Sequence, residues 1–132
     1  MPKRVACSKL VYDGEIFRIE FYVAVNGTAP AEEWLEGLGE KKQQKFAALF
    51  VRLGDHGKIG NEQKFKHLTG TDQVFEFKVD DGRILSFFFF GKRLILTHGF
   101  TKKSAKTPKG EIERAEAYKS DFEEREKSSN GN

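Results

Sequence analysis

Three lysines lie close together near the end of the chain, at Lys102, Lys103 and Lys106. Ammonium groups at such short spacing raise the local positive potential and lower one another's pKa. One of them could therefore carry a proton near neutral pH while the others bind an anion such as phosphate. We expect the chemical role at Lys103 and the binding role at Lys102 and Lys106. A patch that only binds phosphate is an equally good interpretation of each lysine.

Arg83 follows an Asp-Asp-Gly turn and precedes an apolar run. A planar guanidinium can bind two phosphate oxygens at once, which lysine cannot do, so Arg83 is the first candidate for a phosphate contact. A turn-exposed charge is the alternative. Glu76 and Lys78 alternate with two phenylalanines, so we expect both on the open face of a sheet. There Glu76 would be either a base or an ion-pair partner of Arg83.

His98 is a second-rank catalytic candidate. It precedes Phe100 by two residues, so strand alternation predicts that both lie on one side with Leu94 and Leu96. That side faces the core, which favours a buried, hydrogen-bonded structural histidine. A bulge in the strand would reverse this expectation.

The sequence gives little indication of a metal site or of a disulfide bond. Carboxylates and histidines do not cluster at metal-ligand spacing, and the single cysteine, Cys7, excludes an internal disulfide and a Cys-based zinc site. We expect no metal and no other cofactor.

The apolar pattern predicts seven elements in the order β-α-α-β-β-β-α. Alternation, helical spacing and turn signals place them at residues 15–24, 30–38, 40–55, 74–79, 83–90, 93–100 and from 107 onward. Short connections between the last three strands require antiparallel pairing. This order predicts an α+β domain with an antiparallel sheet, two N-terminal helices on one face, a C-terminal helix, and a face left partly open.

The boundaries follow from the same pattern. We expect an N-terminal extension over residues 1–14, a single domain over 15–127 and a disordered tail over 128–132. The four phenylalanines at 87–90 are predicted to lie in the core, and Thr107-Pro108 is predicted to be the capped start of the last helix.

Positive charge is concentrated in the middle of the chain. Residues 41–110 carry 15 basic and 6 acidic side chains, whereas residues 1–40 and 111–132 each carry 4 basic and 7 acidic ones. A basic middle between acidic ends favours a surface that binds a polyanion. A solvated lysine-rich face explains the same distribution.

Composition excludes several classes of protein. With 132 residues, of which 38% are hydrophobic, the chain can bury the core of one domain and is not wholly disordered. It has no apolar run near the roughly 20 residues that cross a bilayer, and its N-terminus lacks the apolar segment of a secretory signal. We therefore expect a soluble cytoplasmic protein without a membrane partner.

The segment from His98 to Pro108 is the most specific part of the chain. It resembles the "GF-x-KK-x-x-K-TP" signature of the RelE/ParE toxin superfamily, in the HigB-like branch that includes phage-derived relatives. Weaker matches lie in order along the chain, at Trp34-Leu35, Lys66-His67-Leu68, Val74 to Lys78, and Gly82-Arg83-Ile84. The resemblance covers about residues 17–118.

The resemblance implies a compact fold like that of small microbial ribonucleases and a toxin of a two-gene toxin–antitoxin module. Most RelE- and HigB-like members cleave messenger RNA in the ribosomal A site, whereas ParE-like members poison DNA gyrase and are not nucleases. The implied partners are the ribosome, messenger RNA and a cognate antitoxin, which is commonly a helix-turn-helix protein.

The resemblance also implies roles for individual residues. Arg83 matches the arginine that holds the scissile phosphate, and Lys64 and Lys66 match a basic stretch that lines the substrate cleft. Lys78 departs from the family because an arginine is usual there, and Ile112 stands where some members have a tyrosine. RNA cleavage without a metal uses the ribose 2′-hydroxyl as nucleophile and needs a proton acceptor, cations and an acid.

These observations predict a ribosome-dependent messenger RNA endonuclease. Its catalytic candidates are Arg83, Lys103, His98 and Glu76, and its RNA-binding candidates are Lys64, Lys66, Lys78, Lys102 and Lys106. A gyrase inhibitor that acts by binding and a catalytically silent RNA-binding module remain as alternatives.

Overall fold

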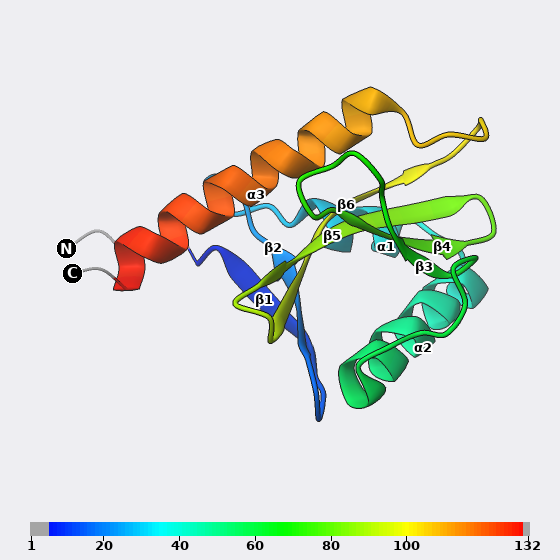
Figure 1. Cartoon of the computed structure of the whole chain (residues 1–132), viewed down its shortest axis with the longest axis horizontal. Helices are drawn as coiled ribbons and strands as arrows, with labels where there is room; N and C mark the ends of the chain where they lie inside the picture. The colour runs from blue at the N-terminus through cyan, green and yellow to red at the C-terminus, as the bar shows by residue number, and fades with distance from the viewer. Residues whose placement is uncertain (1–5, 131–132) are drawn as a thin grey trace.

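A mixed sheet of six strands runs through the computed structural model, which describes residues 6–130. The strand order is β1-β2-β6-β5-β4-β3 (Figure 1). The strands are β1 (Ser8–Asp13), β2 (Arg18–Tyr22), β3 (Phe65–His67), β4 (Phe75–Val79), β5 (Gly82–Phe89) and β6 (Arg93–Thr101). The helices are α1 (Pro30–Glu36), α2 (Glu40–His56) and α3 (Lys109–Asn130).

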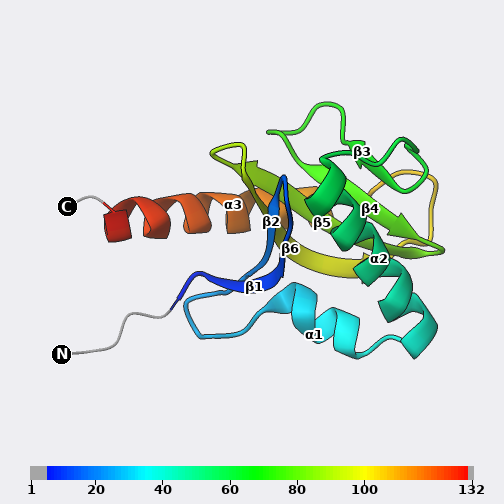
Figure 2. The ribbon, with the colours of Figure 1, turned by 90° about the horizontal axis from the view of Figure 1, so that it is seen from below.

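Helices α1 and α2 cover one face of the sheet. In Figure 2, α1 runs beneath β6 and α2 crosses the strands beside it. The apolar stripe of α2 packs on this face through Phe46, Phe50 and Leu53, and Phe50 meets Phe77 of β4 edge to face at 5.1 Å. The helix ends at Gly57, whose φ of 77° is a left-handed conformation that glycine adopts without steric cost.

The close packing of Trp34 of α1 against β6 explains why the residue before Phe100 is a glycine, Gly99. A Cβ atom on Gly99 would overlap the Trp34 ring, and a Cβ on Gly82 would lie 2.9 Å from that ring. The two glycines therefore let α1 approach the sheet closely. Phe100 lies on the opposite face, in a cluster with Leu85 under α3.

Helix α3 covers part of the other face, and in Figure 1 the sheet lies between α3 and α2. Phe122 of α3 meets Phe87 and Phe89 of β5 edge to face, at 5.5 and 5.1 Å. Arg93 anchors the far half of the helix, since its Nη1 donates to Glu126 at 2.6 Å and its Nε donates to Glu20 at 2.7 Å. Strand β5 is thus covered on both faces over much of its length, as the apolar run over residues 83–90 predicts.

The α+β class and the predicted helices are confirmed, and the fold is compatible with the RelE-like fold that the resemblance implies. The sheet is not antiparallel throughout, because β2 and β6 pair in parallel. Two strands are missing from the predicted order. β1 lies within the predicted N-terminal extension, and β3 is a three-residue edge strand at Phe65, where the sequence predicts an extended stretch within a loop over residues 58–73.

Three smaller expectations differ from the structure at turns and ends. Phe90 is not in the core, because it lies in the β5–β6 turn at a φ of 54° and is 85% exposed. Thr107 does not cap α3, since its hydroxyl donates to Glu76 instead. Residues 128–130 of the predicted disordered tail belong to α3, and residues 131–132 lie outside the described part.

A β-bulge at Thr97 reverses the side on which the following β6 side chains lie. His98 pairs with Leu85, but Leu96 pairs with the next residue of β5, which leaves Thr97 as the extra residue. Leu94 and Leu96 pack under α1 and α2, whereas His98 lies on the α3 face. The prediction that these three share one side is therefore wrong, while the predicted burial of His98 is confirmed at 1% exposure.

Candidate functional site

Charged residues gather on the sheet face that α3 leaves uncovered. The helix begins only at Lys109, and its first turns lie over Leu85 and Phe100. Beyond them, four cations and one acid lie together. We call this group the cationic cluster; it comprises Lys66, Lys78, Arg83 and Lys102 with Glu76.

Strand pairing brings these residues together from four segments of the chain. Lys66 of β3 lies opposite Glu76 of β4, and Lys78 of β4 lies opposite Arg83 of β5. Lys102 follows β6 directly, and its backbone N–H donates to the carbonyl of Asp81 at 2.7 Å. Alternation along β4 sends the phenylalanines toward α2 and the charged residues to the other face, as predicted.

Glu76 is the acid of the cluster and is 0% exposed. Thr107 donates a hydrogen bond of 2.5 Å to its Oε2. Its Oε1 has no hydrogen-bond partner and lies 3.8 Å from Nε of Arg83. A buried carboxylate requires a compensating cation, so Glu76 and Arg83 form the ion pair that was one of the two predicted arrangements for Glu76.

Arg83 is held in place from two sides. Its Nη1 donates to the backbone carbonyls of Asp80 and Gly82, at 2.7 and 2.9 Å, and its Nε faces Glu76. Its side chain is 13% exposed, and Nη2 makes no hydrogen bond to a residue within 6–130. An anion that approaches from solvent would therefore meet Nη2 and not the whole guanidinium fork.

Lys78 has the most perturbed environment among the cluster lysines. It is half-buried, and burial lowers its pKa below the ordinary lysine value. The positive charges of Lys66, Arg83 and Lys102 lower this pKa further, while Glu76 opposes them. The sequence predicted that the lysines after β6 lower one another's pKa. In the structure, the lysine whose pKa is lowered by neighbouring cations is instead Lys78, on β4.

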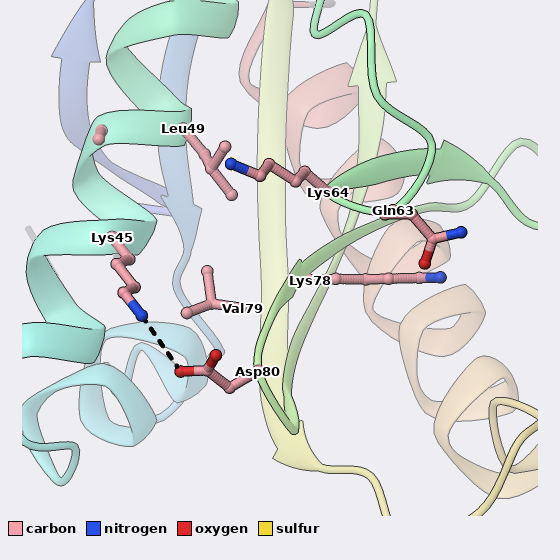
Figure 3. Close-up of a pocket in the computed structure, with 8 residues that line it drawn as sticks. Lys45, Leu49, Gln63, Lys64, Lys78, Val79 and Asp80 are labelled. Atoms are coloured by element: carbon pink, nitrogen blue, oxygen red, sulfur yellow. Dashed lines mark ion pairs between the residues drawn. The ribbon is translucent and has the colours of Figure 1, made fainter.

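The other predicted cations lie apart from this cluster. Lys103 and Lys106 are exposed in the loop between β6 and α3, and neither is among the charges that act on Lys78. Lys64 lies just before β3, and its side chain is directed toward α2 (Figure 3). The structure therefore groups Lys66, Lys78 and Lys102 with Arg83 and Glu76, and leaves Lys64, Lys103 and Lys106 outside.

His98 lies beneath α3 in a hydrogen-bonded network. Its Nε2 is 3.0 Å from an oxygen of Glu111, and its Nδ1 is 3.1 Å from the hydroxyl of Thr97. Burial, together with the charge of Arg114, lowers the pKa of His98 to about 4, against the effect of Glu111. His98 is therefore neutral near pH 7, and its ring has no open path to solvent.

A pocket of about 360 Å³ lies next to the cluster, between α2 and the edge of the sheet (Figure 3). Two polar residues that line this pocket, Lys45 and Gln63, were not predicted from the sequence, and neither was the bond from Thr107 to Glu76. Lys45 carries no sequence signal beyond being one of several lysines on α2. Thr107 was noticed, but the Thr-Pro pair is also the usual signal of a helix cap.

Two further features of the described residues concern metal binding and membrane insertion. Within residues 6–130, no group of three His, Cys, Asp or Glu side chains is arranged to hold a metal ion. Among the helices of this described part, none has the length and apolar character that a membrane span requires.

Comparison with known families gives one match. A family model described as phage-derived protein Gp49-like matches residues 33–120, about two thirds of the chain. The matched part runs from α1 into α3 and contains every residue of the cationic cluster. No curated protein matches the chain significantly.

Proposed function

The chain belongs to the Gp49-like family of phage-derived proteins, and from this premise we propose that it is a toxin that cleaves messenger RNA on the ribosome. The toxin class is supported by the resemblance of residues 98–108 to the RelE- and HigB-like signature. The nuclease activity is supported by one observation above all: Lys78, a lysine with a lowered pKa, lies opposite the half-buried Arg83 among further cations.

The proposed reaction is a metal-free transesterification. The ribose 2′-oxygen forms a bond to the adjacent phosphorus, and the bond from phosphorus to the 5′-oxygen breaks. The products are a 2′,3′-cyclic phosphate and a 5′-hydroxyl. Lys78, as the free amine, accepts the proton of the 2′-hydroxyl and returns it to the 5′-oxygen, so it ends in the protonation state in which it began.

The remaining cluster residues stabilise charge and hold geometry. Nη2 of Arg83, with Lys66 and Lys102, neutralises the negative charge that develops on the phosphorane. Glu76 does not touch the substrate in this proposal. It is a positioning residue, since its buried carboxylate fixes the Arg83 guanidinium from behind.

An antitoxin encoded beside the gene is the proposed partner, because the toxins that this sequence resembles are encoded in two-gene modules with their antitoxins. Co-expression of the neighbouring reading frame should restore growth to cells that express the toxin. Co-purification of the two proteins would identify the complex directly.

The proposal is tested by controlled expression of the wild type and of Arg83→Ala, followed by mapping of RNA ends. We expect the wild type to arrest growth and to produce cuts in the A-site codon, and we expect Arg83→Ala to do neither. Growth arrest without such cuts, with Arg83→Ala equally toxic, would contradict a nuclease. A supercoiling assay would then show whether gyrase is the target.

A further inference from the structure

The pocket beside α2 lies on the other side of the sheet edge from the cationic cluster. The backbone N–H of Lys78 donates to the carbonyl of Lys64 at 2.9 Å, and this bond forms the ridge between the two. Figure 3 shows the Lys64 side chain directed toward Leu49 of α2, while the Lys78 side chain points away from that helix. A chain that crosses this ridge would contact both the pocket and the cluster.

The floor of the pocket is aliphatic. Leu49 and Val79 are buried core residues whose side chains line the pocket, and Ala48 of α2 extends this apolar surface toward solvent. A flat apolar group, such as a nucleobase, can lie on such a floor and lose contact with water.

The rim of the pocket is polar and mainly cationic. The cationic side chains at the rim are those of Lys45 and Lys64, with one acid, Asp80, whereas the side chains of Lys78 and Gln63 point away from α2 (Figure 3). Lys45 pairs with Asp80 at 3.6 Å, but both side chains are more than half exposed. A pair this exposed contributes little free energy, so Lys45 can turn toward an arriving phosphate at small cost.

We propose that this pocket binds one nucleotide of single-stranded RNA that flanks the cleaved bond. The base lies on the aliphatic floor, and its phosphate is bound by Lys45 and Lys64 at the rim. This inference rests on the proposed nuclease function and deepens it. The pocket volume of about 360 Å³ lies in the range of small-ligand sites, and Lys78 belongs both to the lining of the pocket and to the cluster.

Two pairs of matched variants test the pocket. Ala48→Trp fills it, whereas Ala47→Trp introduces the same side chain one position earlier on the exposed side of α2, outside this pocket. Lys45→Gln removes a rim charge, whereas Lys127→Gln removes an exposed charge from the far end of α3. All four positions are exposed, so we expect each variant to fold, which circular dichroism checks.

The probe is a fluorescently labelled five-nucleotide single strand that carries 2′-deoxyribose at every position and therefore cannot be cleaved by 2′-hydroxyl attack. We expect Ala48→Trp to weaken its binding, measured by anisotropy, about tenfold, and Lys45→Gln to weaken it about threefold. Ala47→Trp and Lys127→Gln should bind like the wild type.

The outcomes separate this inference from the proposed function. Equal binding by Ala48→Trp and Ala47→Trp, or no binding of the probe by the wild type, would overturn the pocket even if RNA is cleaved on ribosomes. Selective loss of binding in Ala48→Trp would support the pocket even if the wild type cleaves no RNA, in which case only the nuclease proposal fails.

Discussion

Lys78 and Arg83 lie directly opposite each other on β4 and β5, on the sheet face that α3 leaves uncovered. Two cations in such a pair repel each other, and cross-strand pairs of like charge are destabilising. The buried Glu76, 3.8 Å from Arg83, offsets part of this repulsion. An arrangement that costs stability and leaves Lys78 with a lowered pKa is typical of a functional site.

Arg83→Lys tests whether the guanidinium is needed beyond its charge. Lysine keeps the charge but cannot donate to the carbonyls of Asp80 and Gly82 while facing Glu76. We expect RNA cleavage to fall by about 100-fold, which corresponds to the loss of one oriented donor. Single-turnover cleavage on programmed ribosomes measures this. Cleavage at the wild-type rate would show that Arg83 acts only as a point charge.

Glu76→Gln and Thr107→Val test the interactions that hold Arg83 in place through Glu76. Glu76→Gln removes the negative charge that faces Arg83, and Thr107→Val removes the donor to Oε2. Each should lower the free energy of unfolding by about 1–3 kcal/mol, because each leaves a buried polar group without its partner. Chemical denaturation measures both.

The double variant shows whether the two groups act together. Glutamine at position 76 can still accept from Thr107, so the cycle combines Thr107→Val with Glu76→Leu; since Thr107 and Glu76 share one hydrogen bond, these two effects should not add. Fully additive losses would contradict a direct bond between them.

Gly99→Ala tests the close approach of α1. A Cβ at this position would overlap the Trp34 ring, so we expect a loss of about 1–3 kcal/mol in the free energy of unfolding. In a Trp34→Leu background, Gly99→Ala should lower the free energy of unfolding by less, because the smaller leucine leaves room for the alanine Cβ. If the alanine costs the same in both backgrounds, the contact does not explain the glycine.

His98 predicts a pH dependence of stability. Its pKa is about 4 in the folded protein and about 6.5 in an unfolded chain, so the unfolded state binds more protons between these values. The stabilisation is complete above pH 6.5 and is lost as the pH falls toward 4. Between pH 7 and pH 5 the free energy of unfolding should fall by about 2 kcal/mol.

The matched variant for this prediction is His98→Gln, which keeps a polar side chain but does not titrate. Denaturant unfolding at pH 7 and pH 5 should show a smaller difference for this variant than for the wild type. An equal difference in both proteins would mean that His98 is not the titrating group in this range. Glu111 and Arg114 are the charged groups that act on it.

Local patterns in the sequence predicted much of the fold. A helix or strand that buries one side carries apolar residues at a regular spacing, and this spacing can be recognised in the sequence. The stripe of Phe46, Leu49, Phe50 and Leu53 specified α2, and alternation along β4 specified which face carries Glu76 and Lys78. Long-range pairing was not predictable in this way. The parallel contact of β2 with β6 joins segments about 75 residues apart, and no local pattern distinguishes it from an antiparallel one.

The site was predicted in part for the same reason. Arg83 and Glu76 were paired correctly because they flank one tight turn. The bulge at Thr97, which moves His98 to the other face, has no reliable sequence signal. The environment of Lys78 depends on charges from β3, β5 and the segment after β6, so only the assembled sheet shows why its pKa is lowered.

The most direct test of the proposed chemistry is Lys78→Arg, because arginine keeps the positive charge but does not give up its proton. Binding of the uncleavable strand should stay within about threefold of wild type, while cleavage on ribosomes should fall by about 100-fold or more. The wild-type rate should rise with pH toward the lowered pKa of Lys78, and the variant should lack this rise. Wild-type cleavage with an unchanged pH profile in Lys78→Arg would contradict the role of Lys78 as the proton carrier.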